Sequence, residues 1–526
     1  MPEEKRKHLD EDAVLLLNKG KRGLGRLIFG RTAIIILLLA AQFLLLFFGF
    51  WQLSGSLVYG VSLLIGLAVT LTIVNKPANP AIKITWIILI MLAPIFAVPF
   101  YLFVSMDWGH RLTRAMLDEI SQKTARYVHK DLEGIRALRE QSPQMGSLAD
   151  YMERSRQQLY YKDSRVRYLP SGEAFFAEVL ERLKQAKRFI FLEYFIVEEG
   201  YMWGRILSIL QRKVKEGVDV RLLYDGTCAI GKLPYQYPQQ LKALGIRCKM
   251  YAPLRPFIST HYNNRDHRKI LVVDGRTAFT GGINLADEYI NRRILHGHWK
   301  DTAVMITGAA VRSFTLMFLQ MWSLTEYRDK DFSPYLDASR PVSGDGWVLP
   351  YCSSPFQQEK VGEMAYMDIL NQAVRYVHIT TPYLIIDHEL TTALTFAAKR
   401  GVDVKLILPG HPDKRTVFAL TRSYYPELLA GGVEIYEYTP GFIHAKMFVS
   451  DDSTAVVGSI NLDYRSLYLH FECAALLYRC AAVADVERDF QRTLSKCRPI
   501  TLEDCRRDAL PRRAVGWLLR PLAPLM

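Results

Sequence analysis

The sequence predicts an α/β protein of two similar lobes, each a mixed sheet flanked by helices, with pseudo-twofold symmetry and preceded by N-terminal transmembrane helices. Three observations predict this fold. A long uncharged stretch lies near the N-terminus, and short apolar runs then alternate with amphipathic stretches. The pattern of this second region also occurs twice along the chain, which indicates a duplicated unit.

The N-terminal stretch is long enough for more than one membrane crossing. Residues 32–75 form a run of 44 residues without charge or histidine, whereas one crossing needs about 20 residues. A secretory signal has an apolar region of only about 7–15 residues, so a signal is excluded. A buried helical core, or two crossings with a re-entrant piece, remain alternatives. We predict crossings at about 32–52, 55–74 and 84–104, within a membrane region of 32–104.

The basic segment 1–31 favours a cytoplasmic N-terminus by the positive-inside rule. Three crossings would place everything after Val104 on the outer side, but basic residues between 111 and 126 compete with that orientation. The remaining units follow from changes in composition. They are a charged, surface-lying helical connector at 105–150, a first lobe at 151–330, a linker at 331–346, a second lobe at 347–500, and a C-terminal tail at 501–526 that is either interfacial or packed on the second lobe.

Charge and cysteine content limit the possible functions. The chain has 67 Lys+Arg and 53 Asp+Glu, a net charge of +14, which favours an anionic partner such as nucleic acid or phospholipid. The seven cysteines include no CxxC pair. A disulfide scaffold is therefore excluded and a zinc ribbon is disfavoured.

The most informative motif is a duplicated H-x-K-x4-D. The first copy contains His267, Lys269 and Asp274. The second contains His444, Lys446 and Asp451. Seven residues after each aspartate the sequence reaches a small-residue turn, Gly281-Gly282-Ile283-Asn284 or Gly458-Ser459-Ile460-Asn461. Because both parts recur at the same spacing, chance is a negligible explanation.

This pattern suits the chemistry of a phosphodiester. His and Lys two residues apart on a strand point to one face, so two facing lobes present two imidazoles and two ammonium groups. The lysines, with Asn284 and Asn461, can neutralise phosphate oxygens. One histidine can attack phosphorus while the other transfers protons. Asp301 lies downstream of His267 and Glu472 downstream of His444, each on the strand that follows, and we expect these carboxylates to fix the histidine tautomers.

The motif aspartates have two interpretations. Asp274 and Asp451 either take part in the chemistry or form the turns that end their strands. No acidic cluster with the character of Mg²⁺ ligands lies beside the motifs. We therefore expect no metal and no cofactor.

The doubled motif with its G-[GS]-x-N turn resembles the signature of the phospholipase D superfamily, and the apolar N-terminus is similar to that of bacterial cardiolipin synthases. The resemblance implies that His267 is the nucleophile and His444 the acid/base. It also implies transphosphatidylation, in which two phosphatidylglycerol molecules give cardiolipin and glycerol. Anionic phospholipid, a membrane and no nucleic acid would then be the partners, in a multi-pass protein of the bacterial inner membrane. The extra apolar run 32–52 departs from the family pattern.

Other functions remain open at this stage. A hydrolytic phospholipase D would use water as acceptor, and a related synthase would use another phospholipid. A nucleic-acid phosphodiesterase is disfavoured because much of the positive charge flanks the predicted crossings instead of an aromatic groove. A catalytically inactive membrane scaffold is disfavoured because both motifs are intact.

Overall fold

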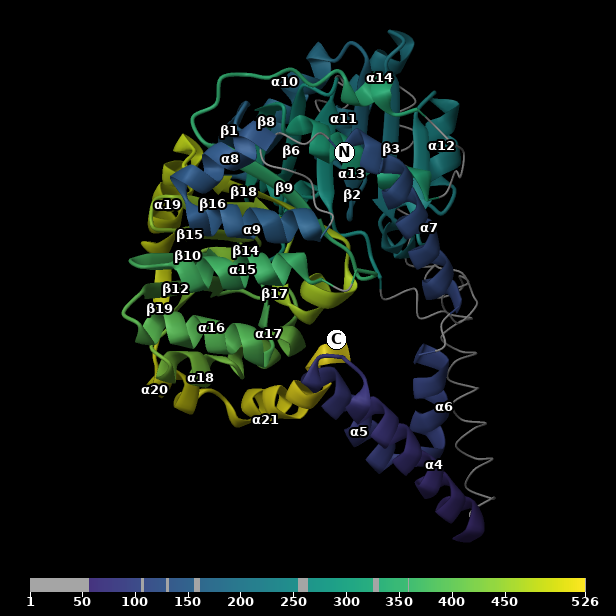
Figure 1. Ribbon diagram of the computed structural model, residues 1–526, viewed down its shortest axis with the longest axis vertical. Helices are drawn as coiled ribbons and strands as arrows, with labels where there is room; N and C mark the ends of the chain where they lie inside the picture. Colours follow the sequence, from purple (N-terminus) through teal and green to yellow (C-terminus); the bar gives the residue numbers. More distant parts are fainter. Residues whose placement is uncertain are drawn as a thin grey trace.

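The computed structural model describes residues 56–105, 108–128, 132–155, 161–253, 264–324, 331–357 and 359–525. Figure 1 shows two α/β lobes in contact and a group of N-terminal helices that extends away from them. The predicted crossing at 32–52 and the basic segment 1–31 lie outside the described residues.

Three helices form the N-terminal group. Helix α4 (Ser56–Asn75) covers the second predicted crossing. The third predicted segment, 84–104, is divided between two helices, α5 (Pro80–Leu92) and α6 (Pro94–Ser105). Between them Ala93 is non-helical, with φ −148° and ψ 67°, since a proline disfavours helical geometry in the residue before it. Among the described residues, no helix combines the length and the apolarity that a membrane crossing requires.

The connector is helical but is not only a solvated surface. It comprises α7 (Trp108–Thr124), the 3₁₀ turn η3 (Ala125–Tyr127), α8 (Leu132–Gln141) and α9 (Pro143–Arg154). Apolar side chains of α8 and α9 enter the core of the second lobe, among them Leu138, Met145 and Met152. The expectation of a surface-lying connector is corrected for these two helices, because their apolar faces are buried at helical spacing.

Each lobe is built on a mixed sheet. In the first lobe the strand order is β1-β8-β6-β5-β2-β3-β4; β2, β3 and β4 are parallel, and β5 joins β2 in the antiparallel sense. The strands are β1 (Ser164–Leu169), β2 (Phe189–Tyr194), β3 (Asp219–Asp225), β4 (Arg247–Tyr251), β5 (Lys269–Val273), β6 (Thr277–Gly281) and β8 (Ala303–Gly308). The helices of this lobe are α10 (Gly172–Gln185), α11 (Tyr201–Lys215), α12 (Tyr237–Ala243) and α13 (Val311–Ser323).

The second lobe repeats this order as β9-β18-β16-β15-β10-β12-β13 and adds β19 at the edge. Its strands are β9 (Trp347–Ser353), β10 (Tyr376–Thr380), β12 (Asp403–Pro409), β13 (Glu434–Tyr438), β15 (Met447–Ser450), β16 (Thr454–Gly458), β18 (Glu472–Tyr478) and β19 (Cys497–Ile500). Its helices are α15 (Val361–Gln372), α16 (His388–Lys399), α17 (Arg415–Arg422), α18 (Tyr425–Ala430) and α19 (Ala481–Leu494). The identical order confirms the predicted duplication of an α/β unit. The linker contains one short helix, α14 (Ser333–Leu336).

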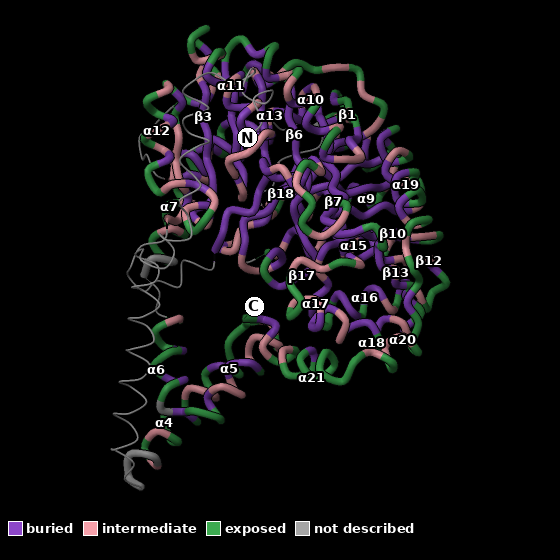
Figure 2. The backbone as a smooth tube through the Cα atoms, turned by 180° about the vertical axis from the view of Figure 1, so that it is seen from behind, coloured by how far each residue is buried: buried purple, intermediate pink, exposed green. Residues whose placement is uncertain are grey.

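The two sheets share one hydrophobic core. Buried side chains from both lobes form a single cluster, which includes Val304 and Ile306 of β8 and Val449 of β15. Figure 2 shows the strands of both lobes as largely buried and α21 as largely exposed. The lobes also exchange backbone hydrogen bonds, because β7 (His298–Lys300) pairs in parallel with β14 (Gly441–Ile443).

The C-terminal tail connects the second lobe to the N-terminal helices. It forms α20 (Leu502–Arg507), α21 (Leu510–Leu519) and η8 (Arg520–Leu525). A Cβ on Gly516 would lie 2.5 Å from the carbonyl oxygen of Ala419 in α17, which shows how closely α21 approaches that helix. The Thr85 hydroxyl of α5 donates to the carbonyl of Pro521 at 2.6 Å. The tail therefore packs on the second lobe, while Trp517 remains 78% exposed.

Candidate active site

The two motif histidines lie where the lobes meet. His267 lies two residues before β5, and its amide donates to the carbonyl of Phe471 at 2.9 Å. His444 occupies the equivalent place before β15, and its amide donates to the carbonyl of Lys300 at 2.7 Å. Each carbonyl belongs to the opposite lobe and to the residue directly before a buried carboxylate. Backbone pairing between lobes therefore places each histidine beside an acidic residue of the other lobe.

The histidine–carboxylate pairs are exchanged between the lobes. His267 Nδ1 lies 2.9 Å from Glu472 Oε1 and 3.0 Å from Oε2. His444 Nδ1 lies 2.7 Å from Asp301 Oδ2. Both carboxylates are fully buried. A carboxylate at Nδ1 holds the proton on that nitrogen and leaves Nε2 for chemistry, so the two acidic residues have the geometry of tautomer-fixing groups.

The motif lysines lie beside the histidines and are almost completely buried. Lys446 Nζ is 2.8 Å from His444 Nδ1, and Lys269 Nζ donates to the carbonyl of His267. Burial lowers the pKa of Lys269 to about 8 and that of Lys446 to about 7. A bound anion would favour the charged ammonium form of both lysines.

The surroundings of the two imidazoles favour their neutral form. Burial, assisted by the nearby lysine charges, lowers the pKa of His267 and His444 well below the usual value. Burial also raises the pKa of Asp301 to about 7 and raises that of Glu472. A neutral imidazole can attack phosphorus or accept a proton. A phosphate anion between the rings would favour protonation of one of them.

The motif aspartates lie at the other end of their strands. The carboxylate of Asp274 accepts three backbone amides, at 2.7–2.9 Å, and Asp451 does the same at 2.8–2.9 Å. The donors are Lys187, Arg188 and Phe189 for the first and Val374, Arg375 and Tyr376 for the second. Both aspartates have left-handed backbone, with φ +55° and +53°. Within the described residues, neither carboxylate has a hydrogen bond to a motif histidine or lysine. These contacts support the interpretation of both aspartates as turn-forming residues. They give no support to a catalytic role.

The two turn asparagines differ in what they already bind. Asn284 is fixed at both ends, because Oδ1 accepts the Ile196 amide at 3.0 Å and Nδ2 donates to the Tyr289 hydroxyl at 2.7 Å. Asn461 is also buried, but its Oδ1 has no hydrogen-bond partner among the described residues. Asn461 therefore keeps one end of its amide for a ligand.

The residue after each turn glycine contacts the carboxylate of its own lobe. A Cβ on Gly282 would lie 2.1 Å from Asp301 Oδ1, so a larger residue would collide with that carboxylate. The equivalent residue, Ser459, donates its hydroxyl to Glu472. Gly and Ser at this position thus match the two different carboxylates.

Ring neighbours distinguish the two histidines. The ring centroid of His267 lies 4.9 Å from that of Phe195 and 5.6 Å from that of His470. Around His444 the neighbours are Tyr289, Trp299 and Phe442, at 5.4, 5.5 and 5.8 Å. Sequence reasoning missed these rings. One signal was available, because Trp299 and His470 each lie two residues before a tautomer-fixing carboxylate.

A possible metal-binding group lies at the same place. His267, His470 and Glu472 bring ligand atoms within 4.8 Å of one another, and two imidazoles with a carboxylate are a donor set that zinc accepts. Both Glu472 oxygens already lie within hydrogen-bond distance of His267 Nδ1, so this geometry is that of a histidine–carboxylate pair.

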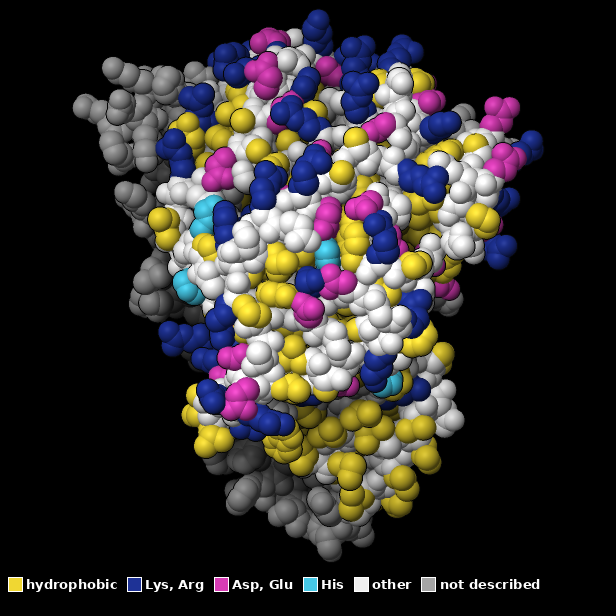
Figure 3. Space-filling view, turned by 90° about the vertical axis from the view of Figure 1, so that its left-hand side faces the viewer, with side chains coloured by type: hydrophobic (Ala, Val, Ile, Leu, Met, Phe, Trp, Pro, Cys, Tyr) yellow, Lys and Arg dark blue, Asp and Glu magenta, His cyan; other side chains and the backbone are white. Residues whose placement is uncertain are grey.

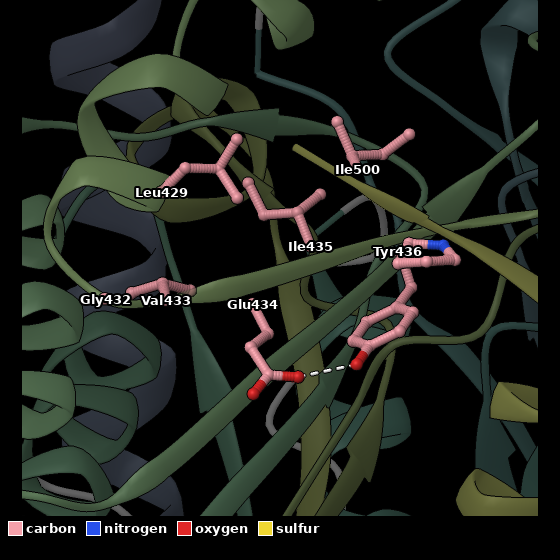
Figure 4. Close-up of a pocket in the computed structure, with 8 residues that line it drawn as sticks. Leu429, Gly432, Val433, Glu434, Ile435, Tyr436 and Ile500 are labelled. Carbon is pink, nitrogen blue, oxygen red and sulfur yellow. Dashed lines mark hydrogen bonds between the residues drawn. The ribbon is translucent and has the colours of Figure 1, made fainter. Parts of the chain in front are cut away.

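A surface pocket lies elsewhere, at the β13–β19 edge of the second sheet (Figure 4). Its volume is about 330 Å³, and Glu434 accepts a hydrogen bond from the Tyr436 hydroxyl at 2.5 Å within it. The lining residues are Leu429, Gly432, Val433, Glu434, Ile435, Tyr436, Pro499 and Ile500. None belongs to the duplicated motif, so this pocket is separate from the histidine site.

Comparison with solved structures supports the fold. The phosphatidylserine synthase of Haemophilus influenzae Rd KW20 superposes with a TM-score of 0.53 and 17% identity, over 69% of this chain and 93% of that one. An uncharacterized protein of Streptococcus mutans is 48% identical over 457 residues, which are 87% of this chain and 99% of that protein.

Sequence comparison identifies the family. Cardiolipin synthases of Halalkalibacterium halodurans and a Geobacillus species are 34% and 35% identical, over 94% of this chain and 99% of each relative. Residues 179–322 and 366–494 match the family model described as the cardiolipin synthase, PLD-like domain. The chain therefore belongs to the cardiolipin synthase family of phospholipase D-like proteins and is a phosphatidyltransferase.

Proposed function

We propose that this enzyme makes cardiolipin by moving the phosphatidyl group of one phosphatidylglycerol to a free hydroxyl of a second, with release of glycerol. The observation that carries the proposal is the pair of exchanged histidine–carboxylate contacts at 2.7–3.0 Å. They provide one imidazole for attack and one for proton transfer. Relatives with the name cardiolipin synthase, similar along 99% of their length, favour this reaction over others in the family.

In the first step Nε2 of His267 attacks phosphorus and a phosphorus–nitrogen bond forms. The bond from phosphorus to the glycerol oxygen breaks, and protonated His444 gives its proton to the leaving alkoxide. Lys269 and Lys446 stabilise the charge on the phosphoryl oxygens. Glu472 and Asp301 hold the two rings in orientation.

In the second step His444, now neutral, removes the proton from a hydroxyl of the second phosphatidylglycerol. That oxygen attacks phosphorus, the phosphorus–nitrogen bond breaks, and His267 is regenerated with cardiolipin as the product. Because the phosphatidyl group stays covalently bound to His267 between the two steps, an alcohol can serve as its acceptor in place of water. The assignment of nucleophile to His267 is part of the proposal.

Membrane attachment is also part of the proposal, through residues 32–104 as a multi-pass anchor in the bacterial inner membrane. Support comes from apolar side chains that remain exposed, including Leu64 on α4 (69%), Leu92 at the end of α5 (78%) and Trp517 on α21 (78%). In Figure 3 hydrophobic side chains gather at the lower end of the molecule, where Figure 1 places the N-terminal helices. Burial of this apolar surface in lipid would lower the free energy by about 25 cal/mol per Å².

Flotation on lipid vesicles tests the attachment. The full-length protein is expected to float with vesicles that contain phosphatidylglycerol, and Leu92→Ser with Trp517→Ser is expected to reduce the floated fraction several-fold. If the full-length protein stays in the aqueous fraction after lysis without detergent, the attachment is refuted.

Product analysis tests the reaction. The purified protein, incubated with phosphatidylglycerol vesicles, is expected to release glycerol and cardiolipin in equal amounts. Phosphatidic acid without cardiolipin would replace the synthase by a hydrolase. A mixed product that appears only after another phospholipid is added would identify a different acceptor.

A further inference from the structure

A third histidine lies at the site and has no assigned role. His470 follows the π-helical turn η7 (Arg465–Leu469) and comes immediately before the Phe471 carbonyl that binds the His267 amide. It is buried, and neither Nδ1 nor Nε2 has a hydrogen-bond partner among the described residues. A buried polar group without a partner is costly, so such a group in an enzyme site indicates that a ligand completes it.

His470 lies beside His267, the proposed nucleophile. Its ring centroid is 5.6 Å from that of His267. Its Nδ1 is 3.9 Å from Glu472 Oε1, which is too long for a hydrogen bond. The His470 side chain keeps 9% exposure, close to the 8% of His267 and 9% of His444, whereas Glu472 has none. His470 is thus as open to a small ligand as the two motif histidines.

The duplication provides an internal reference for this residue. In the first lobe the equivalent position, two residues before Asp301, holds Trp299. The ring centroid of Trp299 lies 4.7 Å from that of Phe442 and 5.0 Å from that of Tyr289. An indole offers one donor, whereas a neutral imidazole offers one donor and one acceptor. At equivalent positions, the site therefore has an indole beside His444 and an imidazole beside His267.

We propose that His470 is a substrate-binding residue, whose ring nitrogens hydrogen-bond oxygen atoms of the reacting phosphodiester headgroup. The oxygen is either a non-bridging phosphoryl oxygen or a hydroxyl of the alcohol. Arg465, which is exposed at the start of the same turn, places a positive charge near His470 and favours an anionic headgroup there. The inference rests on the proposed phosphatidyl transfer and adds a contact that the duplicated motif does not include.

The experiment compares two substitutions with a matched control. His470→Phe keeps a ring of similar shape and removes both nitrogens, whereas His470→Asn keeps one donor and one acceptor. The control is His378→Phe in the same lobe. His378 is also buried, but its Nδ1 is bound to Glu487 at 3.0 Å, and its ring stacks on Tyr376 and Phe490. Melting temperature, kcat and KM are measured for full-length proteins in phosphatidylglycerol vesicles with detergent.

The expected result is a loss of about 10²-fold in His470→Phe, as for removal of one donor to a reacting oxygen. His470→Asn is expected to recover activity to within about tenfold of the parent, and His378→Phe to keep it. If the loss falls on kcat for cardiolipin formation and for hydrolysis alike, the oxygen is phosphoryl. If KM for added glycerol rises and the product shifts to phosphatidic acid, the oxygen is a hydroxyl.

Two results would overturn the inference. One is activity of His470→Phe within about threefold of the parent. The other is an equal loss in the Phe and Asn variants, which would show that the hydrogen bonds are not the reason. Hydrolysis can be measured even if the parent makes no cardiolipin, so failure of the proposed acceptor and failure of the His470 contact are distinguishable.

Discussion

The two half-sites have the same backbone frame. In each, a histidine amide binds a carbonyl of the opposite lobe, and Nδ1 binds a carboxylate of the opposite lobe. In each, an aspartate at the far end of the strand binds three backbone amides. Duplication has therefore preserved the geometry that positions the imidazoles.

The side chains around that frame are not the same. Glu472 accepts a hydrogen bond from the Ser459 hydroxyl, whereas Asp301 lies against Gly282. Among the described residues, His267 has the rings of Phe195 and His470 as neighbours, whereas His444 has those of Tyr289, Trp299 and Phe442. The shared backbone contacts fix the positions of the two histidines, whereas the side chains that pack around the two rings differ. That difference is what the proposed mechanism uses to give the two histidines separate duties of nucleophile and acid/base.

Removal of either histidine should have the largest effect and should separate the two duties. His267→Ala and His444→Ala are each expected to lower turnover by at least about 10³-fold, because each removes a group needed in both steps. Only His444→Ala is expected to accumulate a phosphatidyl adduct, detected with radiolabelled lipid after an alkaline quench. An adduct in His267→Ala alone would reverse the duties. Unchanged turnover in both variants would refute the mechanism and support a scaffold.

Substitution of the exchanged carboxylates should come next. Glu472→Gln and Asp301→Asn are each expected to lower kcat by about 10³-fold, because the amides no longer fix the histidine tautomer. Stopped reactions should show slower adduct formation in Glu472→Gln. Ser459→Ala removes only the hydroxyl bond to Glu472 and serves as a graded control, with a loss of about tenfold. If Glu472→Gln affected only proton transfer by His444, the exchange of partners would be refuted.

The lysines should give the site its alkaline limit. Because burial lowers their pKa to about 8 and about 7, both ammonium groups lose their protons as pH rises through 7 to 8, and less charge remains to bind phosphate. We expect kcat/KM to fall by about tenfold per pH unit between pH 7 and 8, and by up to about 100-fold per pH unit above pH 8, where both protons are lost. Lys446→Arg keeps its charge and should move the fall to higher pH. A profile that stays flat to pH 10 in the parent would contradict this account.

The motif aspartates should have the smallest effect on catalysis. Asp274→Ala and Asp451→Ala each remove an acceptor from three amides and are expected to cost about 1–3 kcal/mol of stability. Thermal unfolding should show similar losses for the two, with specific activity of the folded protein within about twofold. A large loss of kcat at unchanged melting temperature would show that these aspartates take part in catalysis.

Much of the frame was predictable from sequence. The repeated spacing of His267 and Lys269 with His444 and Lys446 predicts two equivalent strand ends, and the structure has them in two sheets of the same order. Asp301 and Glu472 could be selected as partners of the histidines. Which histidine each one serves could not, because contacts between lobes leave no periodicity in the sequence.

Other features depend on tertiary packing. The break at Ala93 follows from a local rule for the residue before proline, and it divides the apolar run 84–104 between two helices. The burial of α8 and α9 depends on a partner sheet more than 200 residues away in sequence for some contacts, such as Trp347 Nε1 to Gln141. His470 carries no recognisable motif, and only its position beside His267 distinguishes it from an ordinary core histidine.

The exchange of carboxylates has an implication for the origin of the chain. One repeat alone supplies a histidine without its own acidic partner, and an acidic residue without its own histidine. An ancestor with a single repeat could have completed its pairs only by association of two identical chains. Fusion of the two copies would then have released each repeat from self-complementarity. After that, the two copies could diverge, as at His470 and Trp299, and a symmetric assembly could become an enzyme with two unlike sides.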